Sequence, residues 1–294
     1  SAGNTGEEGG TLVYNGGTTG GNIVDGGTID INKASTSYTT PNTVGITPSF
    51  TFTSSGGTVI LGSGTKYYGI SVGANQSYVF EAGSDLVSGN SIINGGTIDI
   101  YAAGITTPNT INQTPEFSFG TSGGTVIIES GVKYQAVSVG TNQSYVFESG
   151  SQLLSANSVI DGGTIVIDYY SVSTTTGAIT TPNTLGWTPS FTFTSSGGTV
   201  IFDGGAKYQG ISVGTNQSYI FESGTSVLSS NSVVNGGNLV IESGASVVGA
   251  TISAGDLTVS AGGTISGTIK LADGASATIW PSAGGTINLS GSTN

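Results

Sequence analysis

A turn followed by a short strand recurs along this chain, and it limits the possible folds more than any other feature. The heptapeptide Asn94-Gly-Gly-Thr-Ile-Asp-Ile100 returns as residues 25–31 and 161–167, and in weaker form as 235–241. Two adjacent glycines permit backbone conformations that other residues avoid, and Thr-Ile-x-Ile alternates polar with β-branched side chains. Such alternation is typical of a half-buried β-strand. The sequence therefore predicts tight corners that lead into short strands.

Longer segments repeat as well, and their spacing suggests a solenoid. The segment 67–84 returns as 134–151 and again as 208–225, and the second interval is slightly longer than the first. Near the C-terminal end the strand motifs that start at Asn238, Asp256 and Ser276 follow one another at less than a third of that spacing. The short interval is too small for a globular unit and suits one coil of a parallel β-helix. We therefore predict an all-β parallel β-helix (solenoid) in which each long repeat holds about three coils.

The repeats divide the chain as follows: opening coils at 1–24, long repeats at 25–93, 94–160 and 161–234, and short-repeat coils at 235–294. We interpret these segments as one continuous β-helix. Each long repeat also contains a loop that we expect to protrude, because proline cannot donate to a central ladder and six of the seven prolines fall there. These prolines are Pro41, Pro48, Pro108, Pro115, Pro182 and Pro189.

Aromatic residues near the loops and corners are the candidates for contact with a partner. The Phe-x-Phe that follows each loop either turns both rings inward as the coil resumes, or belongs to an arm that offers rings to a partner. The Tyr-x-Phe that follows each Asn-Gln-Ser is expected to place one ring inward and one outward, which leaves the tyrosines or the phenylalanines as an outward row. The contact candidates are Tyr78, Tyr145, Tyr219 and Trp187.

The charge and composition argue against several functions. Seventeen acidic residues against five lysines and no arginine give a net charge of -12, so nucleic acid is an improbable partner. The chain has no His and no Cys, which removes the commonest general base and the usual zinc ligands. The chain contains no Gly-Gly-x-Gly-x-Asp run of the kind that binds calcium. It also has no apolar run that approaches the ~20 residues needed to span a bilayer. We expect no enzyme, no cofactor, no metal and no membrane insertion.

The corner motifs resemble those of a known family. Ser54-Ser-Gly-Gly-Thr58, Glu222-Ser-Gly-Thr225, Glu242-Ser-Gly-Ala245 and Ser260-Ala-Gly-Gly-Thr264 resemble the passenger repeats of AIDA/TibA-type self-associating autotransporter adhesins. The resemblance implies right-handed winding, export through the periplasm, and display at the bacterial cell surface or secretion. It also implies self-association between passengers, cell aggregation, biofilm formation, virulence, and attachment to a host-cell receptor or glycan.

The same resemblance implies that a dedicated glycosyltransferase attaches heptose to serines. The matching Ser-Gly corners carry Ser55, Ser122, Ser130, Ser149, Ser196, Ser223 and Ser243. The Asn-Gln-Ser triplets that begin at Asn75, Asn142 and Asn216 also fit an N-glycosylation sequon, but we interpret them as asparagine corners of the coil.

Three other functions remain open at this stage. The chain could be a carbohydrate-binding or polysaccharide-degrading β-helix of the tailspike kind, or an inert stalk. Ice binding would need threonines in register on every coil, whereas the motif Thr51-Phe-Thr53 occurs about once per repeat.

Overall fold

The computed structural model is built of short strands that wind into a parallel β-solenoid. It describes residues 5–6, 10–15, 22–32, 50–62, 66–67, 70–81, 84–86, 91–101, 117–129, 133–134, 137–148, 151–153, 158–168, 191–203, 207–208, 210–227, 232–280 and 286–289. All strand pairings within this part of the chain are parallel, and it contains no helix that could cross a membrane. The predicted all-β parallel β-helix is therefore confirmed, and the model is consistent with right-handed winding.

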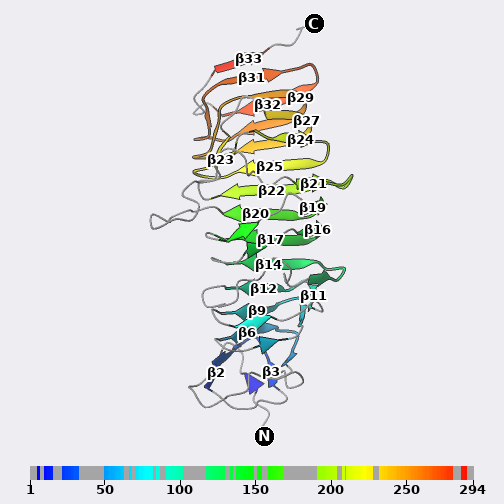
Figure 1. Ribbon diagram of the computed structural model, residues 1–294, viewed down its shortest axis with the longest axis vertical. Helices are drawn as coiled ribbons and strands as arrows, with labels where there is room; N and C mark the ends of the chain where they lie inside the picture. Colours follow the sequence, from blue (N-terminus) through cyan, green and yellow to red (C-terminus); the bar gives the residue numbers. More distant parts are fainter. Residues whose placement is uncertain are drawn as a thin grey trace. The chain divides into compact units, whose positions relative to one another are not determined.

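The chain forms two compact units, and the strands of each unit lie on three sides of the coil, where one side can hold more than one hydrogen-bonded sheet. Unit 1 comprises Ser1–Gln135 with Asn142–Ser144, and unit 2 comprises Ala136–Thr141 with Tyr145–Asn294. We call the sheets broad, narrow and corner. Figure 1 shows strands of the broad sheet lying side by side in each unit, such as β20, β22 and β25 in unit 2.

The strands of unit 1 have the following bounds. Its broad sheet contains β2 (Thr11–Asn15), β4 (Thr28–Asn32), β6 (Gly57–Leu61), β9 (Gln76–Phe80), β12 (Thr97–Ile100) and β14 (Gly124–Ile128). The narrow strands are β1 (Thr5–Gly6), β3 (Asn22–Val24), β5 (Phe50–Phe52), β8 (Ser71–Gly73), β11 (Ser91–Asn94) and β13 (Phe117–Phe119). The corner strands are β7 (Lys66–Tyr67), β10 (Asp85–Leu86) and β15 (Lys133–Tyr134), and β17 (Gln143–Phe147) is divided between the two units.

Unit 2 follows the same plan. Its broad sheet contains β20 (Thr164–Asp168), β22 (Gly198–Asp203), β25 (Gln217–Phe221) and β32 (Ala275–Ile279). The narrow strands are β16 (Ser138–Gly140), β19 (Ser158–Asp161), β21 (Phe191–Phe193), β24 (Ser212–Gly214), β31 (Thr268–Leu271) and β33 (Thr286–Leu289). The corner strands are β18 (Gln152–Leu153), β23 (Lys207–Tyr208), β26 (Ser226–Val227), β28 (Ser246–Val247) and β30 (Thr264–Ile265). β27 (Ser232–Ile241) and β29 (Ala250–Val259) run through both the narrow and the broad sheet, and their mutual register shifts at the bend.

The strand register gives the number of coils in a repeat. In the broad sheet Thr58 pairs with Ser77, Ser77 pairs with Thr97, and Thr97 pairs with Thr125. Thr58 and Thr125 are equivalent positions of two successive long repeats. One long repeat therefore advances by three coils, as the periodicity predicts.

The core lies inside the coil and is filled by alternate residues of the broad strands. In unit 2 the two inner residues of β22 are Val200 and Phe202, each at most 1% exposed. Phe202 stacks on Phe221 of the next coil, with ring centroids 4.9 Å apart and an interplanar angle of 29°. Similar side chains therefore lie over one another from coil to coil, and no single coil could bury its core alone.

The tyrosines lie inside this core, so the expected outward row of rings is wrong. Tyr78, Tyr145 and Tyr219 are only 5–8% exposed, and the Phe two residues after each is at most 1% exposed. Residues i and i+2 of a strand point to the same face, so Tyr-x-Phe turns both rings inward and the intervening Val or Ile outward. Burial raises the pKa of Tyr78 and Tyr219 to about 12, and it also raises the pKa of Tyr145.

The Phe-x-Phe motifs turn inward as well, which the burial interpretation predicts. The middle residue of each motif is exposed and both phenylalanines are half-buried. In unit 1 the rings of Phe50 and Phe52 lie 6.2 and 5.7 Å from the ring of Tyr78, in edge-to-face geometry. The loops that precede these motifs, with Trp187, lie outside the described residues.

Asparagine corners fit against glycine corners of the preceding coil. Asn75, Asn142 and Asn216 adopt positive φ angles of 62°, 63° and 62°, which asparagine tolerates better than most residues. The turn points the Asn75 carbonyl at the previous coil, where it accepts a hydrogen bond of 2.9 Å from the amide of Gly57. Gln76 holds the same turn, because its Oε1 accepts a 2.8 Å hydrogen bond from the amide of Gly73. The corner interpretation of Asn-Gln-Ser is confirmed.

Candidate functional site

The outer surface of the broad sheet, here the broad face, carries two parallel columns of side chains. The first column holds a short polar residue on each coil: in unit 1 Thr28, Thr58, Ser77, Thr97 and Thr125, and in unit 2 Thr164, Thr199, Ser218, Asn238, Asp256 and Ser276. The second column lies two residues further along each strand: Asp30, Ile60, Val79, Asp99 and Ile127 in unit 1, and Val166, Ile201, Ile220, Val240, Thr258 and Thr278 in unit 2. The second column of unit 2 is β-branched on all six coils and has no charge.

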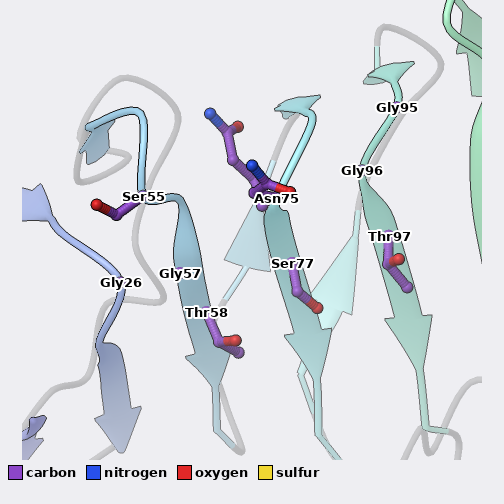
Figure 2. Close-up of a pocket in the computed structure, with 10 residues that line it drawn as sticks. Gly26, Ser55, Gly57, Thr58, Asn75, Ser77, Gly95, Gly96 and Thr97 are labelled. Carbon is purple, nitrogen blue, oxygen red and sulfur yellow. The ribbon is translucent and has the colours of Figure 1, made fainter. Parts of the chain in front are cut away.

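An open polar depression of about 490 Å³ lies at one edge of the broad face in unit 1. Figure 2 shows Thr58, Ser77 and Thr97 side by side on neighbouring strands, with Ser55 and Asn75 at the corners above them. Glycines line much of the rest, and no residue that lines the depression is acidic or basic. Its hydroxyl and amide groups can donate and accept hydrogen bonds, but they provide no ionisable acid or base.

The outer surface of the narrow sheet, here the narrow face, presents one apolar side chain per long repeat between hydroxyl groups. In unit 1 Ile92 is 47% exposed and pairs with Ser71 on one side and Ser118 on the other. In unit 2 Val233 is 37% exposed and pairs with Ser212 and Thr251. Single exposed apolar side chains are common on protein surfaces, so the distinguishing feature of these two is that they occupy the same position of the repeat.

Val159 is the equivalent residue in the second long repeat, and Ile23 has the equivalent position in the opening coils, before the first long repeat. Ile23 is 38% exposed and pairs with Thr51, and Val159 is half-buried between Ser138 and Thr192. The arrangement therefore recurs at the same position of the repeat throughout the described part of the chain.

Side chains from successive coils join at the corners between the narrow and broad sheets. The Thr53 hydroxyl donates to Asp25 Oδ1, and the amide of Ser55 donates to Thr53 Oγ1 at 3.3 Å. The hydrogen bond from Thr53, followed by that from Ser55, lowers the pKa of the Asp25 carboxyl. In the second repeat Asn94 takes this place, and its Oδ1 accepts a 3.0 Å hydrogen bond from the amide of Ser122.

Unit 2 has the same corner at Asp161. Thr194 donates its hydroxyl to Asp161 Oδ1, and hydrogen bonds from Thr194 and then Ser196 lower the pKa of this carboxyl. The Asp or Asn before Gly-Gly therefore has two roles: it favours the turn, and its side chain accepts a hydrogen bond from the next coil.

A column of carboxylates borders the broad face of unit 2. Asp203, Glu222 and Glu242 directly follow strand residues that pair across three neighbouring coils. Partial burial raises the pKa of Glu222, and the negative charges of Asp203 and Glu242 raise it further. Because the folded-state pKa is raised, the folded protein holds this proton more tightly, and the ionised carboxylate reduces stability at neutral pH.

We expect Glu222→Gln to raise the thermal midpoint at pH 7 by a small amount, on the order of 1 °C, because Glu222 is only partly buried and solvent screens its charge. The difference from the wild type should shrink as the pH falls through the raised pKa, where the wild-type carboxyl is protonated. Melting curves followed by circular dichroism between pH 4 and pH 7 (a range of about three pH units that covers the ordinary Glu pKa) measure it. Glu81→Gln is the matched control, because Gly62 and Tyr101 replace the neighbouring carboxylates there. A gain from Glu222→Gln that is independent of pH would contradict the charge explanation.

The predicted contact tyrosines and the predicted glycosylation serines differ in their burial. Tyr78, Tyr145 and Tyr219 are in the core and cannot form a contact surface. Five of the candidate serines are exposed at corners: Ser55, Ser122, Ser196, Ser223 and Ser243. Ser130, Ser149 and Trp187 lie outside the described residues. Among the described residues no group of three or more His, Cys, Asp or Glu side chains could hold a metal ion.

The two outer faces were missed by the sequence analysis. The columns of the broad face combine Thr from Gly-Gly-Thr with Ser from Asn-Gln-Ser, so a search for one motif finds only part of them. The exposed residue of the narrow face directly precedes a buried one, as in Ile92-Ile93 and Val233-Val234, and only the coil geometry distinguishes the two.

No protein-family model, no curated protein and no solved structure matches this chain.

Proposed function

We propose that this chain is part of the passenger of a bacterial surface adhesin that aggregates cells by binding copies of itself. The observation that carries the proposal is the narrow face, where an outward β-branched side chain lies between hydroxyls once in every long repeat, exposed at Ile92 and Val233 and half-buried at Val159. Export through the periplasm to the cell surface, biofilm formation and attachment to host cells complete the proposal, and they rest on the resemblance of the corner motifs.

The narrow face suits many weak contacts with another copy. Burying a half-exposed Ile or Val contributes about 1 kcal/mol, and a net hydrogen bond between hydroxyls contributes a similar amount. One such patch is too weak to hold two molecules together, but several patches on one chain act together when two copies bind. The outward residues that flank Ile92 and Val233 are uncharged, so the net charge of -12 acts only from a distance.

The exposed corner serines are our proposed acceptors for O-linked heptose. Ser223 and Ser243 lie on successive coils between the broad and corner sheets, and both residues are exposed. Sugars there would leave the narrow face open for self-association.

We expect cells that display the chain to sediment together at low salt and at about 0.5 M NaCl alike, where charges are screened beyond a few ångströms. The variant Ile92→Lys with Val233→Lys should abolish most of the sedimentation, because two lysines would be buried without partners in each contact. The matched control is Ile201→Lys with Thr258→Lys, which adds the same charge to the broad face. Loss of sedimentation at high salt, or equal loss in both variants, would contradict the proposal. No sedimentation of wild-type cells would favour the inert stalk.

A further inference from the structure

The broad face of unit 2 has a second property that self-association does not use. Its columns form a two-dimensional array over six strands, from β20 to β32. Neighbouring strands are about 4.8 Å apart, and alternate residues of one strand about 6.7 Å apart. The hydroxyls of Thr164, Thr199 and Ser218 occupy one column, and the β-branched side chains of Val166, Ile201 and Ile220 occupy the other.

These side chains are held in fixed positions. β-branched residues have few χ1 rotamers, and packing against neighbours on a pleated sheet restricts them further. Each position pairs with its equivalents on both sides, as Ile201 does with Val166 and Ile220. The face therefore presents hydroxyls and methyl groups at regular intervals, without the conformational freedom of long polar side chains.

We propose that the broad face of unit 2 binds ice. The oxygen atoms of hexagonal ice repeat at intervals close to the two spacings of this array. Hydroxyls on the first column can replace water molecules of the lattice, since each has one donor and two acceptor sites. Methyl groups on the second column order the water between the columns without competing for its hydrogen bonds. Thr-x-Thr motifs are not needed, because Thr-x-Val, Thr-x-Ile and Ser-x-Ile place the required groups in register.

Charged side chains are absent from both columns on β20, β22 and β25. The second column has no charged residue on its six strands, and the carboxylates of Asp203, Glu222 and Glu242 stand at the border. The first column carries one charge, Asp256, and its hydroxyls are continuous only over β20, β22 and β25, so the proposed ice-binding area is centred on these three strands. Unit 1 is less suitable, because Asp30 and Asp99 interrupt its second column. Flat crystalline polysaccharides are a poorer match, since no aromatic side chain stands in either column.

The test uses the purified full chain in two assays, thermal hysteresis of a single ice crystal and the shape of that crystal as it grows. We expect the wild-type protein to lower the freezing temperature of the ice crystal below its melting temperature and to produce faceted crystals. Ile201→Lys with Thr258→Lys should lower the hysteresis at least tenfold, because a long charged side chain holds the flat face away from the lattice. Ile92→Lys with Val233→Lys is the matched control and should keep the wild-type activity. Circular dichroism checks that both variants fold.

Absence of hysteresis and of crystal shaping in the wild type would overturn the inference, whatever the variants do. Equal loss of activity in both variants would also overturn it, because the effect would then come from charge and not from the face. Ice binding and cell aggregation use different faces, so each double variant is expected to fail one assay and pass the other. If the aggregation test fails, the ice-binding inference is unaffected, and if the ice-binding test fails, the proposed self-association is unaffected.

Discussion

Replacing Gly197 with alanine is expected to destabilise unit 2 by about 4 kcal/mol, at the upper end of single-residue effects. Gly197 has a φ of +70°, and a Cβ there would lie 1.9 Å from the carbonyl oxygen of Asn216 on the next coil. That oxygen accepts a 3.0 Å hydrogen bond from the amide of Gly198, so it cannot move without breaking the contact between coils. The substitution therefore combines an unfavourable φ with a clash against backbone.

Gly274→Ala is the matched control. Gly274 has a similar φ of +84°, but a Cβ there would meet nothing within 4 Å. The control should cost only about 1–2 kcal/mol, which is the penalty for an L-residue in this region of the backbone. Equilibrium denaturation of the two variants, followed by circular dichroism, measures both values. Equal losses would show that the corner can relax and that the stacking of glycine on asparagine is not a constraint.

Phe221→Ala is the second large effect, and we expect a loss of about 3–5 kcal/mol. Phe221 is fully buried, and its ring stacks on that of Phe202, which is 1% exposed. The interior of a coil is narrow and its width is set by the strands, so the walls cannot close over the space that a phenyl ring leaves. Chemical denaturation gives the loss, and Trp280→Ala, at a residue 55% exposed, should stay within about 0.5 kcal/mol of the wild type. If Phe221→Ala were as mild as Trp280→Ala, the stacked core would not be a main source of stability.

The solenoid fold and the coil count could be predicted from sequence, because both depend on spacing along the chain, whereas right-handed winding was implied only by the resemblance. Gly-Gly-Thr recurs at corners of each long repeat, and the register that connects Thr58 with Thr125 over three coils agrees with the period of the long repeat. The side of the sheet on which the rings lie could also be predicted, because residues two apart in a strand point to the same face. Tyr78 and Phe80 share a face for that reason, and the expectation that they point to opposite faces was wrong.

The contacts between coils could not be predicted in the same way. The sequence separation between Asp25 and Thr53 is 28, whereas that between Asp161 and Thr194 is 33, because the lengths of the intervening segments differ. A motif search uses one spacing, so it does not find partners whose separation changes from repeat to repeat. The same reason hides the two outer faces, whose columns draw one residue from each coil and from different motifs.

Equivalent residues of successive long repeats lie three coils apart and have the same strand register, which limits how the length of the gene can change. Because Thr58 and Thr125 occupy the same place in the strand ladder, removing or duplicating the segment between them rejoins identical hydrogen-bonding edges. Unequal crossing-over between the repeats would then alter the copy number without creating a mismatched junction. Natural variants of this chain should accordingly differ by whole repeats, and the number of outward β-branched side chains on the narrow face should change in the same steps.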